Sequence, residues 1–160
     1  MTKPVFFVDE MLNDLAISLR ICGFVSIYKK WENDDALVSE AKACNGFILT
    51  SDKPLVERCE KIGASAVLVP TSLGKKEKLI FVLKSLRIKE IYPETVCTVC
   101  NGTLERAGKD KVVGNVPDTV LEGFSEFLTC PDCKRVYWQG SHWKRISSFL
   151  DEIRKEIATL

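Results

Sequence analysis

Two Cys-x-x-Cys pairs constrain this chain more than any other feature of its sequence. They are Cys97-Thr-Val-Cys100 and Cys130-Pro-Asp-Cys133. The two-residue spacing lets both sulfurs of a pair reach one ion, and four thiolates complete the tetrahedral shell of Zn²⁺. Such a site leaves no open position for a substrate, so we expect a structural zinc, with any chemistry elsewhere in the chain. Residues 101–129 exceed the usual spacing between knuckles, and we expect a hairpin or a loop insertion there.

The other three cysteines indicate the cellular compartment in which we expect the protein. The chain has seven cysteines, of which Cys22, Cys44 and Cys59 lie outside the two pairs. Their core-like helical positions predict small buried hydrophobic residues. The odd count favours a reducing compartment over a disulfide framework. The N-terminal apolar run is broken at Asp9, which makes it too short for a signal peptide or a membrane span. We therefore expect a cytoplasmic, intracellular protein that does not contact membranes.

Residues 4–90 alternate short apolar runs with helical patterns. The apolar runs, which predict strands, cover residues 5–8, 25–28, 47–50 and 67–69. Helical periodicity or helix-start signals follow near Leu12, Asp34 or Asp35, Lys53 and Lys75. Strands that alternate with helices at such short intervals predict right-handed crossovers and a parallel sheet covered on both faces. The predicted fold class is α/β.

The composition changes near residue 90. Residues 88–96 contain Pro93 and little periodicity, which indicates a linker. We expect one domain over residues 1–90 and a second over residues 91–160, made of a small treble- or ribbon-type zinc module and a C-terminal helix. The apolar stripe of that helix comprises Ile146, Phe149, Leu150, Ile153 and Ile157.

Acidic residues follow the predicted strands at one edge of the sheet. Asp9 ends the first strand, Asp52 ends the third, and Asp34 and Asp35 begin the helix between them. The crevice outside the carboxyl ends of parallel strands is the preferred place for a site. Converging carboxylates suit a hard cation such as Mg²⁺ or Mn²⁺. Each of these residues is also a good helix N-cap, and capping is compatible with metal binding when one oxygen serves each role. Glu10 is a further candidate ligand.

A stretch free of acids follows the second cysteine pair. Its cations are Lys134, Arg135, Lys144 and Arg145, and its aromatic residues are Tyr137, Trp138, His142 and Trp143. Cations can meet phosphates while aromatic rings stack on bases, so the stretch suits RNA. The rings can equally build the small core of the metal module. His142, the only histidine, can stack on a base or form a hydrogen bond within the ribbon.

These motifs together resemble the Mut-seven C-terminal RNase domain family, a PIN-like domain followed by a zinc ribbon. The resemblance spans about residues 5–145. In the first half it is carried by Val8-Asp9-Glu10-Met11-Leu12, Leu15-Ala16, Leu19-Arg20, Gly23, Asp35-Ala-Leu, Ala41, Gly46 and Ile48-Leu-Thr-Ser-Asp52. In the second half it is carried by Cys97-x-x-Cys100-Asn101-Gly102, Val116-Pro117, Cys130-Pro-x-Cys133 and Val136-Tyr137-Trp138-x-Gly140-Ser141-His142-Trp143.

The resemblance implies a metal-dependent ribonuclease that acts on RNA, which we expect to be single-stranded. Asp9, Asp35 and Asp52 would be its Mg²⁺- or Mn²⁺-binding acids. We expect the cations and aromatic residues of the ribbon to hold the substrate. Arg20 is a candidate phosphate contact, or alternatively a cation that stabilises the end of its helix.

Three positions depart from the family pattern. Ile17 and Ser51 replace cations, and Val25 replaces an acid. These replacements keep open a non-catalytic RNA-binding or ribonucleoprotein module. A third alternative is a protein-interaction module that uses residues 136–143. A phospho-receiver would need a fifth strand that ends in a lysine, and the sequence predicts no such strand.

Overall fold

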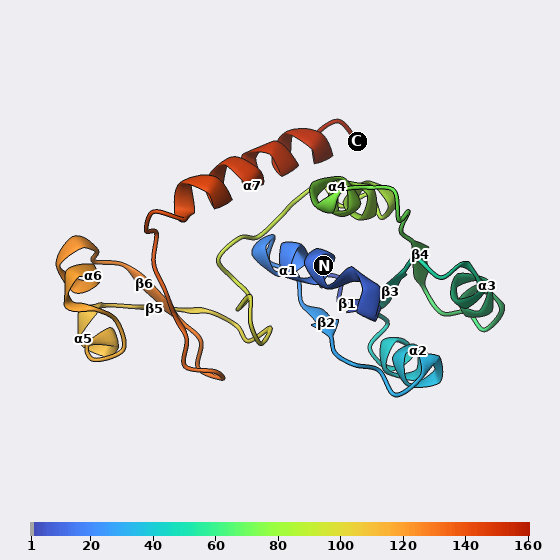
Figure 1. Ribbon diagram of the computed structural model, residues 1–160, viewed down its shortest axis with the longest axis horizontal. Helices are drawn as coiled ribbons and strands as arrows, with labels where there is room; N and C mark the ends of the chain where they lie inside the picture. Colours follow the sequence, from blue (N-terminus) through green and yellow to red (C-terminus); the bar gives the residue numbers. More distant parts are fainter. Residues whose placement is uncertain (1) are drawn as a thin grey trace.

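A computed structural model describes residues 2–160 and places a four-stranded parallel sheet in the first half of the chain (Figure 1). The strands are β1 (Phe6–Val8), β2 (Ser26–Tyr28), β3 (Phe47–Thr50) and β4 (Ala66–Leu68). Their order is β2-β1-β3-β4, and Val8 of β1 pairs with Leu49 of β3. This register brings the residues that follow β1 and β3 to the same edge of the sheet.

Helices cover both faces of the sheet because the strand side chains alternate. Phe6 and Val8 pack in one core with α1 (Asn13–Ile21) and α4 (Lys75–Ser85), while Phe7 packs in another core on the opposite face. That second core includes the apolar sides of α2 (Asp34–Ala43) and α3 (Lys53–Lys61). A short 3-10 helix, η1 (Glu10–Leu12), joins β1 to α1. The prediction of an α/β fold with flanking helices is confirmed.

Two helix ends show how local sequence fixes this fold. Gly23 follows α1 with φ of 85°, and an added Cβ would lie 1.8 Å from the backbone oxygen of Tyr92. Glycine is therefore required where the linker crosses the end of α1. The cap of α2 is Asn33, whose Oδ1 accepts a hydrogen bond from Ala36 N at 2.9 Å. The expected cap at Asp34 or Asp35 is therefore wrong, and both acids lie in the first turn.

The zinc module contains a three-stranded antiparallel sheet in the order β5-β6-β7. Its elements are β5 (Glu105–Ala107), α5 (Lys109–Val112), α6 (Asp118–Gly123), β6 (Phe127–Thr129) and β7 (Val136–Tyr137). Residues 101–129 thus form a β5–β6 pair whose connection contains two short helices. Ala107, Val112, Val116 and Phe127 form a separate small core in this module.

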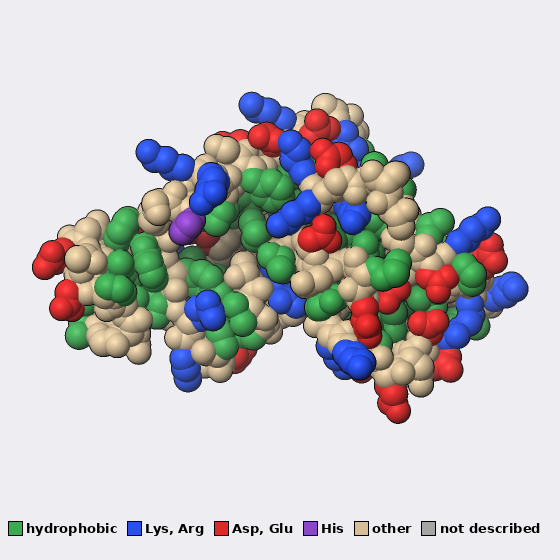
Figure 2. All heavy atoms as spheres, viewed as in Figure 1, with side chains coloured by type: hydrophobic (Ala, Val, Ile, Leu, Met, Phe, Trp, Pro, Cys, Tyr) green, Lys and Arg blue, Asp and Glu red, His purple; other side chains and the backbone are tan. Residues whose placement is uncertain are grey.

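The last helix, α7 (Trp143–Ile157), connects the two halves of the molecule. It runs from the zinc module to α4 (Figure 1). Leu150, Ile153 and Ile157 are buried in the same core as α1 and α4. Charged side chains of both signs are interspersed over the α/β half (Figure 2). None of the helices in residues 2–160 is both long and apolar enough to span a bilayer.

The three remaining cysteines differ in their environments. Cys22 and Cys59 are buried, and burial raises the pKa of Cys22 to about 12. Both therefore serve as small hydrophobic residues, as predicted. Cys44 is exposed at the end of α2, so the prediction of a buried residue is wrong for this position. The helical periodicity that included Cys44 does not extend through the cap, where the chain leaves the helix.

Candidate functional site

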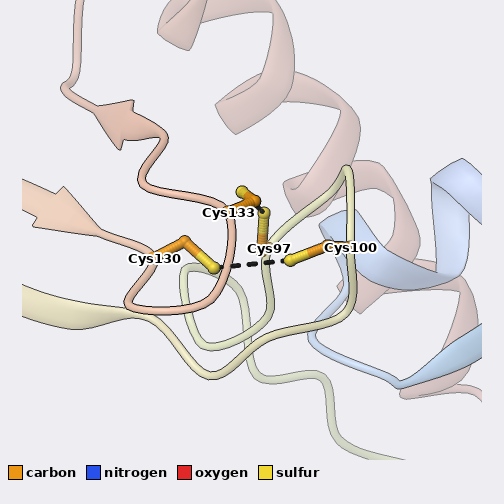
Figure 3. A group of neighbouring side chains, drawn as sticks. All are labelled: Cys97, Cys100, Cys130 and Cys133. Carbon is orange, nitrogen blue, oxygen red and sulfur yellow. Dashed lines mark hydrogen bonds between the residues drawn. The ribbon is translucent and has the colours of Figure 1, made fainter.

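The four paired cysteines converge on one point in the structure (Figure 3). Their sulfurs all lie within 4.8 Å of one another. The Sγ atoms of Cys97 and Cys133 are 3.7 Å apart, and those of Cys100 and Cys130 are 3.4 Å apart. A zinc tetrahedron with Zn–S distances of about 2.3 Å has sulfur–sulfur edges of about 3.8 Å. The donor type and the spacing therefore fit a four-coordinate structural zinc.

The two knuckles share one backbone design. Asn101 and Lys134 each follow the second cysteine of a pair, and both have positive φ, at 67° and 64°. In each knuckle this residue donates its amide to the carbonyl of the first cysteine, Cys97 or Cys130, at 3.0 and 2.8 Å. The left-handed residue closes the turn and directs both sulfurs of the pair to the same side. An added Cβ on Gly102 would lie 2.7 Å from Cys130 Sγ, so the close approach of the knuckles requires glycine there.

Thiolate formation is unequal within the cluster. Burial alone would raise the pKa of Cys97, but hydrogen bonds from the Tyr137 hydroxyl and from the backbone lower it to about 6. The Tyr137 oxygen lies 3.0 Å from Cys97 Sγ. The pKa of Cys100 is raised to about 12, despite a hydrogen bond from Gly102, because neighbouring sulfurs and burial oppose its charge. A bound cation would remove this opposition, since zinc ligands are thiolates.

The first knuckle is joined to the edge of the parallel sheet. The Asn101 side chain accepts from Ser26 N at 2.9 Å and donates to Ser26 O at 2.9 Å, as a neighbouring strand would. Arg20, only 9% exposed, donates to the carbonyls of Ser26, Thr98 and Val99. Burial lowers the pKa of Arg20, while Cys97 and Cys100 oppose that shift. Arg20 was predicted to contact phosphate, but its guanidinium lies inside the fold, where it connects the edge of the sheet to the first knuckle.

The second cluster lies at the carboxyl edge of the parallel sheet. Asp9 Oδ2 accepts a hydrogen bond from Thr50 Oγ1 at 2.7 Å, and Asp9 Oδ1 caps η1 through Glu10 N at 2.8 Å. Thr50 Oγ1 in turn accepts from Asp52 N at 3.0 Å. Asp52 also caps α3 through its contact with Leu55 N. One buried hydroxyl, that of Thr50, therefore connects the Asp9 carboxylate to the backbone amide of Asp52.

Asp35 is placed differently from the other two acids. Its side chain is 84% exposed and forms an ion pair with Arg58 of α3. Within residues 2–160, only the cysteine cluster brings three or more His, Cys, Asp or Glu side chains close enough to hold one ion. Asp9, Asp35 and Asp52 do not form such a group. Glu10 accepts from Trp31 N at 3.1 Å. The structure thus brings Asp9 and Asp52 to one edge and leaves Asp35 on the adjacent helix surface.

The basic and aromatic residues after the second knuckle are mostly exposed. The exposed side chains of this set are Lys134, Arg135, Trp138, His142, Lys144 and Arg145. Trp138 is 36% exposed and lies outside the small core of the zinc module, whereas Trp143 is half-buried against the first core. His142 Nδ1 lies 3.0 Å from a guanidinium nitrogen of Arg145. Lys134 and Arg135 are thus accessible just after the second knuckle, and His142, Lys144 and Arg145 are accessible at the start of α7.

Sequence reasoning did not assign the structural roles of four residues that organise these sites: Thr50, Arg58, Asn101 and Tyr137. The signal for Asn101 was present, because asparagine tolerates the left-handed conformation that follows a knuckle. Thr50 and Arg58 carry no comparable local signal. Their partners, Asp9 and Asp35, are 41 and 23 residues away in the chain.

Comparison with family models completes the description of the site. The model of the Mut7-C RNAse domain matches residues 4–150. The chain belongs to this family. The match covers the parallel sheet, the linker, the zinc module and the first half of α7. Membership in this Mut7-C family indicates a nuclease-like function. Comparisons with curated proteins and with solved structures find no match.

Proposed function

We propose that this Mut7-C domain is a metal-dependent ribonuclease that hydrolyses phosphodiester bonds of single-stranded RNA. The observation that carries the proposal is that Asp9 and Asp52 follow two adjacent parallel strands at one edge of the sheet, where Thr50 links the Asp9 carboxylate to the Asp52 backbone amide. Asp9 and Asp52 would hold Mg²⁺ or Mn²⁺, with Asp35 as a third ligand. One or two carboxylates, completed by waters and substrate phosphates, are the usual protein contribution to a magnesium site.

The chain's own groups have distinct roles in this proposal. Each oxygen of Asp9 accepts one hydrogen bond within the protein and keeps lone pairs for a further partner. A divalent cation bound there supplies charge neutralisation at the phosphate and a lower pKa for bound water. Asp9 or Asp52 can accept the proton of the attacking water as a general base. Asp35 forms an ion pair with Arg58, which would compete with a metal ion for its carboxylate.

The second half of the chain would hold the substrate. We propose that residues 1–90 form the nuclease domain and that residues 91–160, built around a structural zinc, contact RNA. Lys134, Arg135, Lys144 and Arg145 would meet phosphates, because exposed cations bind the backbone of single strands. The intracellular location inferred from the cysteine count belongs to the same proposal.

Labelled single-stranded RNA incubated with Mn²⁺ tests the nuclease. We expect cleavage by the zinc-loaded protein and its loss in the Asp9→Asn plus Asp52→Asn variant. Asp118→Asn is the matched control, because Asp118 is an exposed acid in the first turn of α6. Equal cleavage by the wild-type protein and the double variant would show that the activity does not come from this site.

The structure also favours one alternative, an RNA-binding module that does not cut. Asp35 is engaged by Arg58, and Ser51, which replaces a family cation, donates its hydroxyl to Val69 O at 2.7 Å. Measuring the binding of the same RNA, beside its cleavage, would decide between the two functions. Salt-dependent binding with no Mn²⁺-dependent product would establish the module, since phosphate contacts give a negative slope of affinity against salt.

A further inference from the structure

A recess lies where α1, the zinc module and α7 meet. Its volume is about 230 Å³. Aliphatic side chains line much of it, from α1 (Ile17 and Ile21), the zinc module (Leu104 and Leu128) and α7 (Ile146). Such a lining favours an apolar or aromatic group over water.

Three aromatic side chains complete the walls of the recess. They are Tyr137, Trp138 and Trp143. The Tyr137 hydroxyl faces Cys97 Sγ, so this ring is fixed by the zinc cluster. Trp138 keeps 36% of its surface exposed although it is large and apolar. Exposed aromatic faces of this kind are the surfaces on which unpaired bases stack.

The recess opens into a larger, more polar groove. The groove measures about 890 Å³ and shares with the recess Pro93, Glu94, Leu104, Leu128, Tyr137 and Trp138. It continues past the exposed Arg106 of β5 and past Gln139. An extended chain can therefore follow the groove while one of its side groups enters the recess.

Charge and size limit what can occupy the recess. Lys144 and Arg145 follow Trp143 directly and are exposed. Figure 2 shows Lys and Arg side chains beside a hollow with hydrophobic walls. The charged residues that line the groove are Glu94, Arg106 and Glu126, so the cations available to an anionic chain are Arg106 in the groove and Lys144 and Arg145 next to Trp143 in the chain. A helix of about 10–12 Å diameter is too wide for a recess of this volume, whereas one flat ring system fits.

We propose that the recess binds one unstacked nucleobase of single-stranded RNA. Trp138 and Trp143 supply stacking faces, and the Glu94 carboxylate, which accepts from Gln139 Nε2 at 3.1 Å, can accept an N–H from the base. Arg106, Lys144 and Arg145 meet the flanking phosphates. The inference rests on the proposed function in that the ligand is the RNA substrate of that function, but it concerns binding and not cleavage.

The test uses the zinc-loaded full chain with Asp9→Asn and Asp52→Asn, so that RNA stays intact. A short single-stranded RNA and the same RNA with its bases removed are titrated while tryptophan fluorescence is recorded. We expect the intact RNA to quench fluorescence and to bind about tenfold or more tightly than the abasic RNA, since stacking of one base has an effect of this size. Equal binding of both RNAs overturns the inference.

Two variants locate the base. Trp138→Ala should lower affinity for intact RNA about tenfold and leave affinity for abasic RNA unchanged. Tyr92→Ala is the matched control, because Tyr92 is exposed to 37%, as Trp138 is to 36%, and lies outside the recess. Ile17→Glu places a carboxylate on the recess wall at a position that is already 37% exposed, and it should produce the same loss. Unchanged binding by both recess variants overturns the inference.

Cleavage by the wild-type chain separates this inference from the nuclease proposal. Base-dependent binding without any Mn²⁺-dependent product supports the recess and removes the nuclease. Cleavage that is equally fast for the wild-type chain and for Trp138→Ala, at RNA concentrations below saturation, supports the nuclease and removes the recess.

Discussion

At the scale of single residues, Thr50 links Asp9 to the backbone of Asp52 at the carboxyl edge of the parallel sheet. Its side chain is fully buried, donates to Asp9 and accepts from the Asp52 backbone. A hydroxyl with both roles fixes the orientation of one carboxylate relative to the start of the next helix. Groups that orient metal-binding side chains in this way influence affinity nearly as much as the ligands do.

Replacing Thr50 with valine should therefore weaken the proposed Mg²⁺ or Mn²⁺ site and leave the fold in place. Valine keeps the branched shape but removes the hydroxyl, so Asp9 loses one of its two internal partners. We expect Mn²⁺-dependent cleavage to fall about 10- to 100-fold and the half-saturating Mn²⁺ concentration to rise. Thr50→Ser, which retains the hydroxyl, should stay close to the wild-type protein. Identical Mn²⁺ titrations for all three proteins would contradict this role.

What the sequence could predict at this scale depends on distance along the chain. Asp9 and Asp52 were predictable because each follows an apolar strand, and the cysteines because their spacing is local. Asn101 contacts Ser26 across 75 residues, and Arg58 contacts Asp35 across 23. No local pattern encodes such pairs. For Asp35 the consequence is that its carboxylate is already in an ion pair with Arg58 on the helix surface.

At the scale of elements, the first zinc knuckle protects an edge of the parallel sheet. The strand β2 is an edge strand, and Asn101 pairs with both backbone groups of Ser26 on its open side. Exposed strand edges are sites of unwanted pairing, and proteins commonly cover them. Here the cover directly follows the first cysteine pair, Cys97 and Cys100, whose sulfurs lie in the cluster that fits zinc.

Removal of zinc should loosen β2 before the rest of the sheet. We expect hydrogen exchange at the Ser26 amide to accelerate at least tenfold in the metal-free protein, because Asn101 loses its fixed position. The Ile48 amide, which donates to Ser65 O in the sheet interior, is the internal control and should change less. In the metal-free protein, the pKa of Cys97 is lowered to about 6, so its thiolate is present above that pH and is lost as the pH falls through it. Rebinding of zinc should therefore weaken as the pH falls, since the ligand must be deprotonated.

The starts of α3 and α2 were predictable from the sequence to different degrees. Pro54 and Asp52 fix the start of α3, because the proline suits a first turn and the aspartate caps it. The start of α2 was ambiguous, since Asn33, Asp34 and Asp35 are all favoured capping residues. Contacts with the rest of the fold decide which of these three residues caps the helix, and the sequence does not show those contacts. The β5–β6 pair was expected only as a hairpin or an insertion, because its strands are three residues long.

At the scale of the whole molecule, α7 makes the two halves depend on each other. Its apolar stripe was predictable from periodicity, but the core that receives it was not. The ion pairs Lys76–Glu152 and Lys84–Glu156, at 2.6 and 3.0 Å, join α7 to α4. Exposed pairs contribute about 0–1 kcal/mol each, so the stripe supplies most of the attachment. The boundary near residue 90 stays a prediction, because the last helix of the second half packs in the core of the first.

Ile153→Ala tests this dependence directly. Ile153 is fully buried between α7 and the first core, and removing its side-chain carbons should lower the free energy of unfolding by about 2–5 kcal/mol. Urea denaturation measures this change, and the absorption of Co²⁺ bound in place of zinc reports separately on the cysteine cluster. Lys155→Ala, on the exposed side of the same helix, should change stability by no more than about 0.5 kcal/mol. If Ile153→Ala unfolds at the same urea concentration as Lys155→Ala, α7 does not stabilise the α/β half, and the zinc module alone must hold the chain's second half in place.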